Sequence, residues 1–188
     1  MGCFFVAILV TGTPGVGKTT VSLELARKTG KNYVDIADIV KREKFYKGYD
    51  DVTDSLIVDT AKLKKYLRNL LTCNEVIDTH VVEAVPQEKV THVFVLRLDP
   101  VQLMKRLEQR GYRASKIRQN VEAEILDSIL IDSVRLFGTE KVFEINTTGK
   151  DVSEIVQIIY SILQGNVEEF KPGNVNWLQK YYFLLEQQ

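Results

Sequence analysis

The most informative part of the sequence is Gly12-Thr13-Pro14-Gly15-Val16-Gly17-Lys18-Thr19. It follows the apolar run Phe4 to Val10 and precedes a helical segment, so the order is strand, glycine loop, helix. The pattern G-x-x-x-x-G-K-[ST] in that context is typical of a phosphate-binding loop. Gly15 and Gly17 allow the backbone N–H groups to point inward, toward the positive end of the following helix dipole. We therefore expect the loop to bind a polyphosphate.

Two side chains of this loop predict that the polyphosphate is ATP with Mg²⁺. Lys18 would place a positive charge near the β- and γ-phosphates, and the Thr19 hydroxyl would ligate the metal ion. The glycines do not follow G-x-G-x-x-G, which argues against a dinucleotide. No N-K-x-D sequence is present to recognise guanine, which argues against a Ras-like GTPase.

Short apolar runs along the chain predict a parallel sheet. Each run is too short for a helix, and continuous apolar composition suits strands that are buried on both faces. Alternation with helical segments predicts an α/β fold, a three-layer P-loop NTPase domain whose five-stranded parallel sheet is flanked by helices. After the first strand, the expected strands are Tyr33 to Ile36, Val76 to Asp78, Val93 to Leu96 and Val142 to Ile145.

Capping and spacing signals predict the helices between these strands. Residues 165–188 form a C-terminal helical extension after a single domain of residues 1–164. We expect its helix around Trp177, Tyr181 and Leu185 to pack back on the domain, and docking to a partner or second subunit is the alternative. The earlier helices are expected from the glycine loop to Gly30, from Asp54 or Ser55 to Cys73, from Asp99-Pro100 to Arg110, and from Ser115 to Phe137.

Composition indicates one compact soluble domain. The 188 residues are 45% hydrophobic and 27% charged, and 25 basic residues balance 25 acidic ones. A disordered chain would be less apolar and more strongly charged. The apolar opening stretch is too short to span a bilayer and lacks the basic start of a secretory signal. We therefore expect a cytoplasmic protein with no membrane partner.

Asp78 and His80 are further candidates for the site. Asp78 closes a predicted buried strand, where its carboxylate could hold Mg²⁺ directly or through water, or could cap a turn. His80 follows on the loop and could orient or deprotonate a water molecule, or be merely structural. Both residues are expected near the phosphate-binding loop, because the carboxyl ends of parallel strands meet at one edge of a sheet.

Two basic segments predict flaps over the site. Arg106 and Arg110 are four residues apart on one helix face, which is unfavourable unless an anion such as an ATP phosphate lies beside them. A second basic segment, from Lys41 to Lys47, suggests a second nucleotide. AMP brings its own nucleophilic oxygens, so its phosphorylation needs alignment and charge more than a base. In the alternative, a kinase acting on a sugar hydroxyl, Asp35 or Asp38 would serve as the base.

These motifs together resemble the small adenylate kinases of the isoenzyme-six type, also called CINAP-like, found in archaea and eukaryotes. The resemblance covers about residues 8–163. It rests on GTPGVGKTT at Gly12 to Thr20, KGYD at Lys47 to Asp50, VIDTH at Val76 to His80, FVLR at Phe94 to Arg97 and RLEQRGY at Arg106 to Tyr112.

The resemblance implies roles for particular residues. Residues 15–20, including Gly15, Gly17 and Thr20, would hold the ATP phosphates. Asp78 and His80 would form the second nucleotide motif, Arg110 would reach ATP from the lid, and Arg106 would stack on adenine. The resemblance also implies a role in maturation of the small ribosomal subunit, through ribosomal protein S11 (the counterpart of eukaryotic S14) near pre-ribosomal RNA.

The sequence departs from the family pattern where the AMP phosphate is bound. Arg42 is the only arginine between Lys28 and Arg68, so the arginine pair that usually binds this phosphate is not found in the sequence. Arg97 could share that role. Loss of this interaction would leave an enzyme that is more ATPase than kinase.

The expected activity is transfer of the ATP γ-phosphate to AMP with Mg²⁺. Residues 35–58 would form the AMP-binding segment and residues 109–119 the lid, and backbone groups at Thr147-Thr148-Gly149 could approach the adenine. The alternative is an ATP-switched ribosome assembly factor in which hydrolysis is the main activity.

Overall fold

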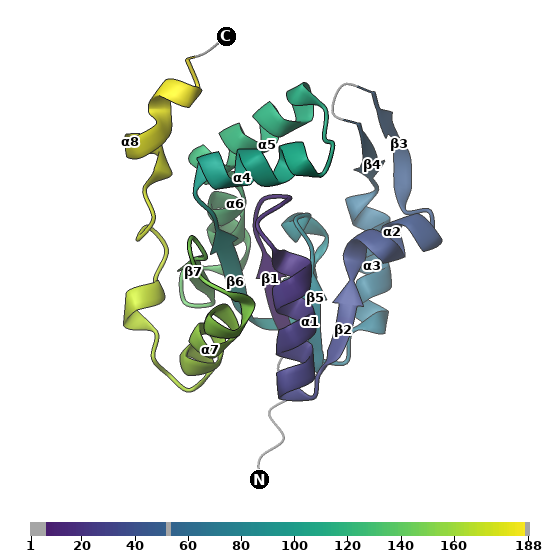
Figure 1. Cartoon of the computed structure of the whole chain (residues 1–188). Coiled ribbons are helices and arrows are strands. Elements are labelled where there is room, and N and C mark those ends of the chain that lie inside the picture. The colour runs from purple at the N-terminus through teal and green to yellow at the C-terminus, as the bar shows by residue number, and fades with distance from the viewer. Residues whose placement is uncertain (1–6, 52–53, 187–188) are drawn as a thin grey trace.

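A five-stranded parallel sheet forms the centre of the protein (Figure 1). The computed structural model describes residues 7–51 and 54–186. The strands follow the order β2-β5-β1-β6-β7, so β1 is central and the chain after it enters the phosphate-binding loop. All four neighbouring pairs are parallel, which confirms the predicted fold class. The strands are β1 (Ala7–Thr11), β2 (Asn32–Asp35), β5 (Glu75–Asp78), β6 (Val90–Arg97) and β7 (Val142–Asn146).

Helices cover both faces of the sheet because the side chains of β1 alternate between two cores. Ile8 and Val10 face one core, and Ala7 and Leu9 face the other. The first core contains side chains of α1 (Lys18–Thr29), α4 (Pro100–Gln109), α5 (Ala114–Ile125), α7 (Val152–Leu163) and α8 (Trp177–Tyr181). The second contains side chains of α2 (Ile36–Arg42), α3 (Thr60–Leu70) and α6 (Ser128–Phe137).

A β-hairpin replaces the start of a predicted helix. Residues expected to begin a helix at Asp54 or Ser55 instead form β4 (Ser55–Val58), which pairs antiparallel with β3 (Tyr46–Asp50). Ile57 and Val58 are β-branched and suit the extended pairing. Helix α3 begins after Asp59, whose side chain accepts a hydrogen bond from the backbone N–H of Lys62 at 3.2 Å.

The predicted helix from Ser115 to Phe137 is broken in two. Asp127 has a φ of 55° and separates α5 from α6. The carbonyl of Glu124 accepts a hydrogen bond from the guanidinium of Arg97 at 2.8 Å, which anchors the break. The break carries the chain from one face of the sheet to the other: Val121 packs in the first core and Leu130 in the second.

The C-terminal extension packs back on the domain, as predicted. Trp177 and Tyr181 are each 7% exposed and belong to the first core. Figure 1 shows α8 on the opposite side of the molecule from the β3–β4 hairpin. Three-residue 3₁₀ helices occur at Val82–Ala84, Gln87–Lys89, Glu168–Phe170 and Tyr182–Leu184.

Candidate active site

The phosphate-binding loop has the backbone that its sequence predicts. Gly15 and Gly17 have φ values of 102° and 112°, in the left-handed region that glycine favours. A Cβ atom at Gly15 would lie 2.8 Å from side-chain carbons of both Leu103 and Leu107, so α4 packs directly against the loop. Thr20 lies in the first turn of α1, which Gly17 caps. The loop therefore presents its amides at a helix N-terminus, a favourable place for an anion.

Lys18 lies at the start of α1 and is only 8% exposed. Its ammonium donates hydrogen bonds to the carbonyl oxygens of Gly12 at 2.8 Å and Thr13 at 3.2 Å. Burial lowers the pKa of Lys18 to about 8, although the negative charge of Asp78 acts in the opposite direction. An anion bound beside Lys18 would restore its full charge, so the side chain is suited to a phosphate group.

Thr19 and Asp78 lie in direct contact, as the sequence suggests. The Thr19 hydroxyl donates a hydrogen bond of 2.6 Å to the carboxylate of Asp78, which also accepts one of 3.2 Å from Tyr33. Burial and the negative charge of Asp78 raise the pKa of Tyr33, so the phenol stays a hydrogen-bond donor. Tyr33, in β2, thus holds the Asp78 carboxylate in place, a contact that the sequence motifs did not predict.

The Thr19 and Asp78 oxygens fit Mg²⁺. A hydroxyl and a carboxylate are hard oxygen ligands, and Mg²⁺ is usually bound by one or two carboxylates together with water and substrate phosphates. Residues 7–51 and 54–186 contain no group of three or more His, Cys, Asp or Glu side chains that could hold a metal ion alone.

His80 lies on the loop after β5, beside the same site. Its side chain is open to the pocket, yet desolvation by the surrounding protein and the nearby charges of Lys18 and Lys116 lower the pKa of His80 to about 4. The imidazole is neutral at pH 7 and can accept a proton or a hydrogen bond from water.

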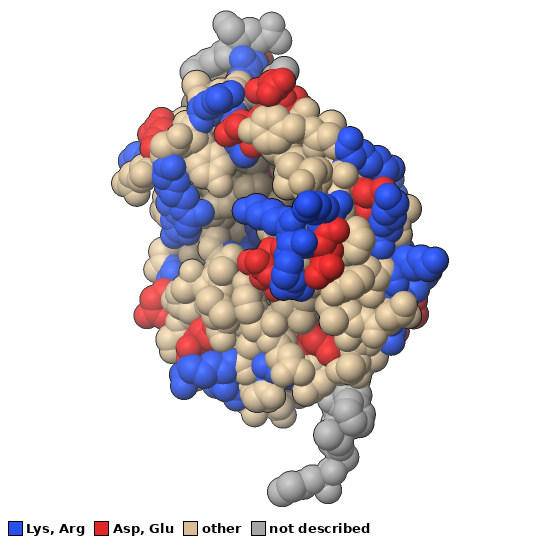
Figure 2. All heavy atoms as spheres, turned by 90° about the vertical axis from the view of Figure 1, so that its right-hand side faces the viewer, with Lys and Arg blue, Asp and Glu red and all other residues tan. Residues whose placement is uncertain are grey.

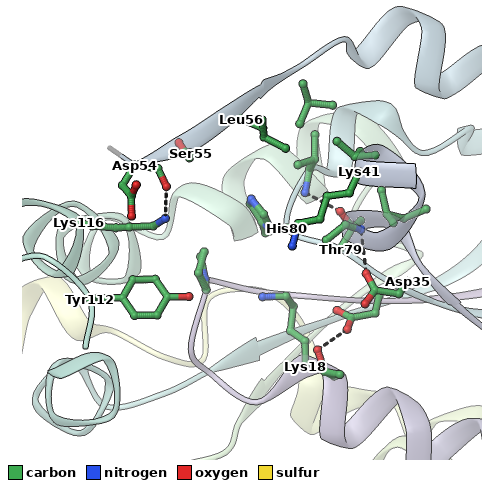
Figure 3. Close-up of a pocket in the computed structure, with 18 of the residues that line it drawn as sticks. Lys18, Asp35, Lys41, Asp54, Ser55, Leu56, Thr79, His80, Tyr112 and Lys116 are labelled. Atoms are coloured by element: carbon green, nitrogen blue, oxygen red, sulfur yellow. Dashed lines mark hydrogen bonds between the residues drawn. The ribbon is translucent and has the colours of Figure 1, made fainter. Parts of the chain in front are cut away.

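A cavity of about 470 Å³ extends from the phosphate-binding loop to the hairpin (Figure 3). Lys18, Thr19, Asp78 and His80 lie at one end of it. Figure 2 shows positively charged side chains on both sides of a hollow in the face that carries α2 and the hairpin. The remaining wall is largely apolar or aromatic and includes Ile36, Val40, Tyr49, Leu56, Val58 and Tyr112.

Lysines supply the positive charge at the far end of this cavity, which we call the acceptor cavity. Figure 3 shows Lys41 and Lys116 entering it from opposite sides. No arginine is among the described residues that line it. In the sequence, Lys41 stood out only as the start of a basic segment, and Lys116 only as a residue within the expected lid, residues 109–119. Sequence analysis could not select them, because their function depends on a cavity formed by distant segments.

The turn between α4 and α5 contacts the hairpin across the acceptor cavity. Lys116 donates a hydrogen bond of 2.7 Å to the carbonyl of Asp54, and Arg113 donates one of 3.4 Å to the carbonyl of Asp51. The Lys116 ammonium also lies 5.1 Å from the centre of the Tyr112 ring. These contacts join the predicted lid to the predicted AMP-binding segment.

A second cavity, of about 180 Å³, lies on the other side of the phosphate-binding loop. Arg106 and Arg110 both line it, together with Gly17, Thr20 and Thr147. Arg106 donates a hydrogen bond of 3.2 Å to the carbonyl of Val16 and so contacts the loop itself. We call this the donor cavity. The two arginines and Thr147 lie together as the sequence analysis expected.

Two predicted site residues lie elsewhere. Arg97 was expected to help bind the AMP phosphate. Its side chain is instead 2% exposed and forms ion pairs with Glu124, Asp127 and Glu144. Although burial disfavours its charge, these carboxylates raise the pKa of Arg97 above its ordinary value. It is therefore engaged in the core and cannot hold AMP.

Asp38, a candidate base for a hydroxyl acceptor, pairs with Arg42 at 2.8 Å on the exposed side of α2. That pair removes both residues from the acceptor cavity. Asp35 does line the cavity, but one of its oxygens accepts hydrogen bonds from the backbone N–H groups of Ala37 at 2.8 Å and Asp38 at 3.2 Å. Its main role is to cap α2.

Comparison with known proteins assigns the family. A family model described as an AAA domain matches residues 8–127. A Methanococcus maripaludis protein named "Putative adenylate kinase" is 37% identical over 184 residues, covering 95% of this chain and 99% of its own. A protein of the same name from Methanosarcina barkeri is 38% identical over 180 residues, covering 90% and 96%. The chain belongs to this archaeal adenylate kinase family.

Membership of the adenylate kinase family confirms the resemblance seen in the sequence and implies ATP as a substrate. The fold is also similar to that of a shikimate kinase from Acinetobacter baumannii in complex with shikimate, with a TM-score of 0.60 and 18% identity, covering 86% of this chain and 94% of that one. At that identity the likeness shows the fold alone. Within the described part of the chain, no helix is long and apolar enough to cross a bilayer.

Proposed function

We propose that the protein transfers the γ-phosphate of ATP to AMP. The main support is that the phosphate-binding loop and the start of α1 contribute to two cavities: Lys18 and Thr19 line one together with Asp78, and Gly17 and Thr20 line the other. ATP would place its nucleoside in the donor cavity beside Arg106 and Arg110, with its phosphates on the loop. AMP would occupy the acceptor cavity.

The charge and shape of the acceptor cavity support a nucleotide as acceptor. Lys41 and Lys116 would neutralise the AMP phosphate, and the wall formed by Leu56, Val58 and Tyr112 would contact the base. A phosphate acceptor needs no protein base, and Asp35, the candidate base that does line the cavity, already caps α2 through one of its oxygens. Closing the lid turn over the hairpin would exclude water from the transfer.

The protein's side chains have distinct roles in this reaction. The positive charge of Lys18 would stay beside the phosphoryl group during its transfer, and Arg110 would stabilise the negative charge that develops on that group. Thr19 and Asp78 would hold Mg²⁺, which would supply positive charge to offset that of the ATP phosphates. His80 would orient water when the acceptor is missing, which gives a slower ATP hydrolysis.

The experiment that tests the proposal compares phosphate acceptors. ADP formation from ATP and Mg²⁺ is measured with AMP, CMP, GMP, adenosine or no acceptor. We expect AMP to give the fastest reaction. Equal rates with and without AMP would disprove the kinase function, and acceleration by adenosine would favour a hydroxyl acceptor instead.

An ATP-switched assembly factor is the second candidate, favoured by the neutral His80 beside the loop and by the lack of any arginine among the described residues that line the acceptor cavity. The roles in small ribosomal subunit maturation and in binding ribosomal protein S11 stay predictions from the resemblance. A pull-down of S11 with and without ATP tests them: nucleotide-dependent capture would support the switch, and nucleotide-independent or absent capture would contradict it.

A further inference from the structure

The C-terminal tail, residues 165–186, is held by a buried carboxylate as well as by apolar packing. Glu144 lies in β7, and its side chain is fully buried. One of its oxygens accepts hydrogen bonds from three consecutive backbone N–H groups of the tail, at Gly173 (2.8 Å), Asn174 (2.9 Å) and Val175 (3.2 Å). A shift of the tail would leave this oxygen of the buried carboxylate without its three hydrogen bonds, which is costly.

The same carboxylate begins a chain of contacts that ends in the phosphate-binding loop. The other oxygen of Glu144 pairs with Arg97. Arg97 in turn donates a hydrogen bond of 2.9 Å to Glu124, whose second oxygen accepts one from the hydroxyl of Thr13. Each of these four residues is at most 2% exposed. The tail and the loop thus share one water-excluded polar network, in which a change at one end alters the partners at the other.

A second contact joins the tail to the helix that carries the arginines of the donor cavity. The hydroxyl of Tyr181 donates a hydrogen bond to the carboxylate of Asp99. The other oxygen of Asp99 caps α4 by accepting hydrogen bonds from the backbone N–H groups of Val101 at 3.0 Å and Gln102 at 3.2 Å. Helix α4 then presents Arg106 and Arg110 to the donor cavity.

The wall opposite the arginines depends on the same network. The backbone N–H and the hydroxyl of Thr147 each donate a hydrogen bond of 2.8 Å to the carbonyl of Arg97. Thr147 lines the donor cavity. Three parts of the donor site therefore contact this network or Asp99: the loop through Thr13, the helix through Asp99 and the wall through Thr147.

We propose that the C-terminal tail positions the donor nucleotide site, through Glu144 and Arg97 to the phosphate-binding loop and through Tyr181 and Asp99 to α4. The inference rests on the proposed binding of ATP at the loop. Because coupling between two sites is reciprocal, bound ATP stabilises the docked tail as much as the docked tail favours ATP. The β3–β4 hairpin, which lines the acceptor cavity, lies on the far side of the molecule from α8 (Figure 1), so we expect AMP binding to be independent of the tail.

Amide hydrogen exchange in the full chain tests the coupling. The probe is the nonhydrolysable ATP analogue adenylyl imidodiphosphate with Mg²⁺. We expect it to slow exchange at Gly173, Asn174 and Val175 by about fivefold, the lower end of typical coupling between sites. Thr13→Val, which removes the hydroxyl, should abolish this slowing, and Thr13→Ser should retain it. If a saturating concentration of the analogue leaves hydrogen exchange in the tail unchanged, the proposal is overturned.

A second measurement separates positioning from mere stability. Tyr181→Phe keeps the buried ring but removes the contact with Asp99, and Tyr182→Phe is the matched control because that side chain is exposed. We expect Tyr181→Phe to raise the Kd of the analogue by about fivefold, as for loss of one hydrogen bond, and to leave the Kd of AMP unchanged. A lower melting temperature with an unchanged analogue Kd would make the contact merely structural.

The two proposals fail separately. If wild-type protein binds the analogue and its tail responds, but AMP does not accelerate ATP consumption, the kinase function fails and the positioning role stands. If AMP accelerates the reaction but the tail does not respond, only the positioning role fails.

Discussion

Thr19 and Asp78 lie 59 residues apart in the sequence, yet their side-chain oxygens are 2.6 Å apart. The contact places the hydroxyl of α1 against the carboxylate that ends β5, before any nucleotide binds. This contact depends on the strand register: β1 and β5 are neighbouring parallel strands, and Val10 pairs with Asp78. The Mg²⁺ proposed to bind with ATP would find this pair of oxygens already in place.

Asp78→Asn should lower turnover by about 100-fold or more, because a neutral amide is a poor ligand for Mg²⁺. Tyr33→Phe removes only a hydrogen bond to Asp78, so it should raise the Mg²⁺ concentration needed for half-maximal activity by about tenfold or less. Mg²⁺ titrations of ADP formation measure both effects. Full activity of Asp78→Asn at an ordinary Mg²⁺ concentration would contradict metal binding at Asp78.

Lys18 should make ATP binding sensitive to pH. Its pKa is lowered to about 8 in the free protein, and a bound phosphate would raise it. Above pH 8 the free protein has lost this proton, so ATP binding must take one up and the Kd should rise, by at most about tenfold per pH unit. Calorimetry in buffers of different ionisation enthalpy measures the proton uptake.

Lys18→Met is the matched control for that titration. The variant should lose both phosphoryl transfer and hydrolysis, and its residual ATP binding should show no proton uptake near pH 8. Proton uptake of the same size in Lys18→Met would assign the titration to another group.

His80 should matter more for hydrolysis than for transfer, because AMP supplies its own nucleophile and water does not. We expect His80→Ala to depress ADP formation without acceptor more strongly than ADP formation with AMP. Since the folded pKa is lowered to about 4, the imidazole remains neutral across the ordinary histidine range near 6.5. The hydrolysis rate should therefore not fall between pH 7 and 5.5. Equal loss of both reactions would refute a special role with water.

Lys116→Met should weaken AMP binding and spare ATP binding. The lysine bridges the lid turn and the hairpin across the acceptor cavity, with 2.7 Å to the Asp54 carbonyl. We expect a KM for AMP raised by about tenfold, as for loss of a hydrogen bond to a charged group. Arg118→Met is the control, because Arg118 pairs with Glu122 on the exposed side of the same helix. A similar effect in both variants would indicate only a general loss of positive charge.

Arg110→Ala should cut turnover by at least about tenfold, or about 1.4 kcal/mol of transition-state stabilisation. Arg110 lines the donor cavity with Gly17 and Thr20, so its charge can reach the phosphates. Lys105→Ala provides the control on the same helix. Steady-state rates at saturating ATP and AMP give the comparison, and unchanged turnover would place Arg110 on a solvated face.

The prediction of one helix from Ser115 to Phe137 was wrong because local helix signals compete there with a tertiary contact. Apolar residues at i, i+4 spacing, from Ile117 to Ile129, predict one helix. The guanidinium of Arg97 instead binds both the Glu124 carbonyl and the Asp127 carboxylate, where the helix is broken. The sequence did hold a signal for this network. Glu124 occupies a position on an apolar helix face, and Glu144 interrupts an otherwise apolar strand.

The phosphate-binding loop and the parallel sheet could be predicted from local patterns, because glycine backbone freedom and apolar runs act over a few neighbouring residues. Which charged side chains line the site depends on tertiary packing. Lys116 meets Asp54 across 62 residues, and Thr13 meets Glu124 across 111. Such contacts depend on how segments pack around the sheet, and no local pattern contains that information. The same packing directs Arg97 into the core and Lys41 and Lys116 into the acceptor cavity.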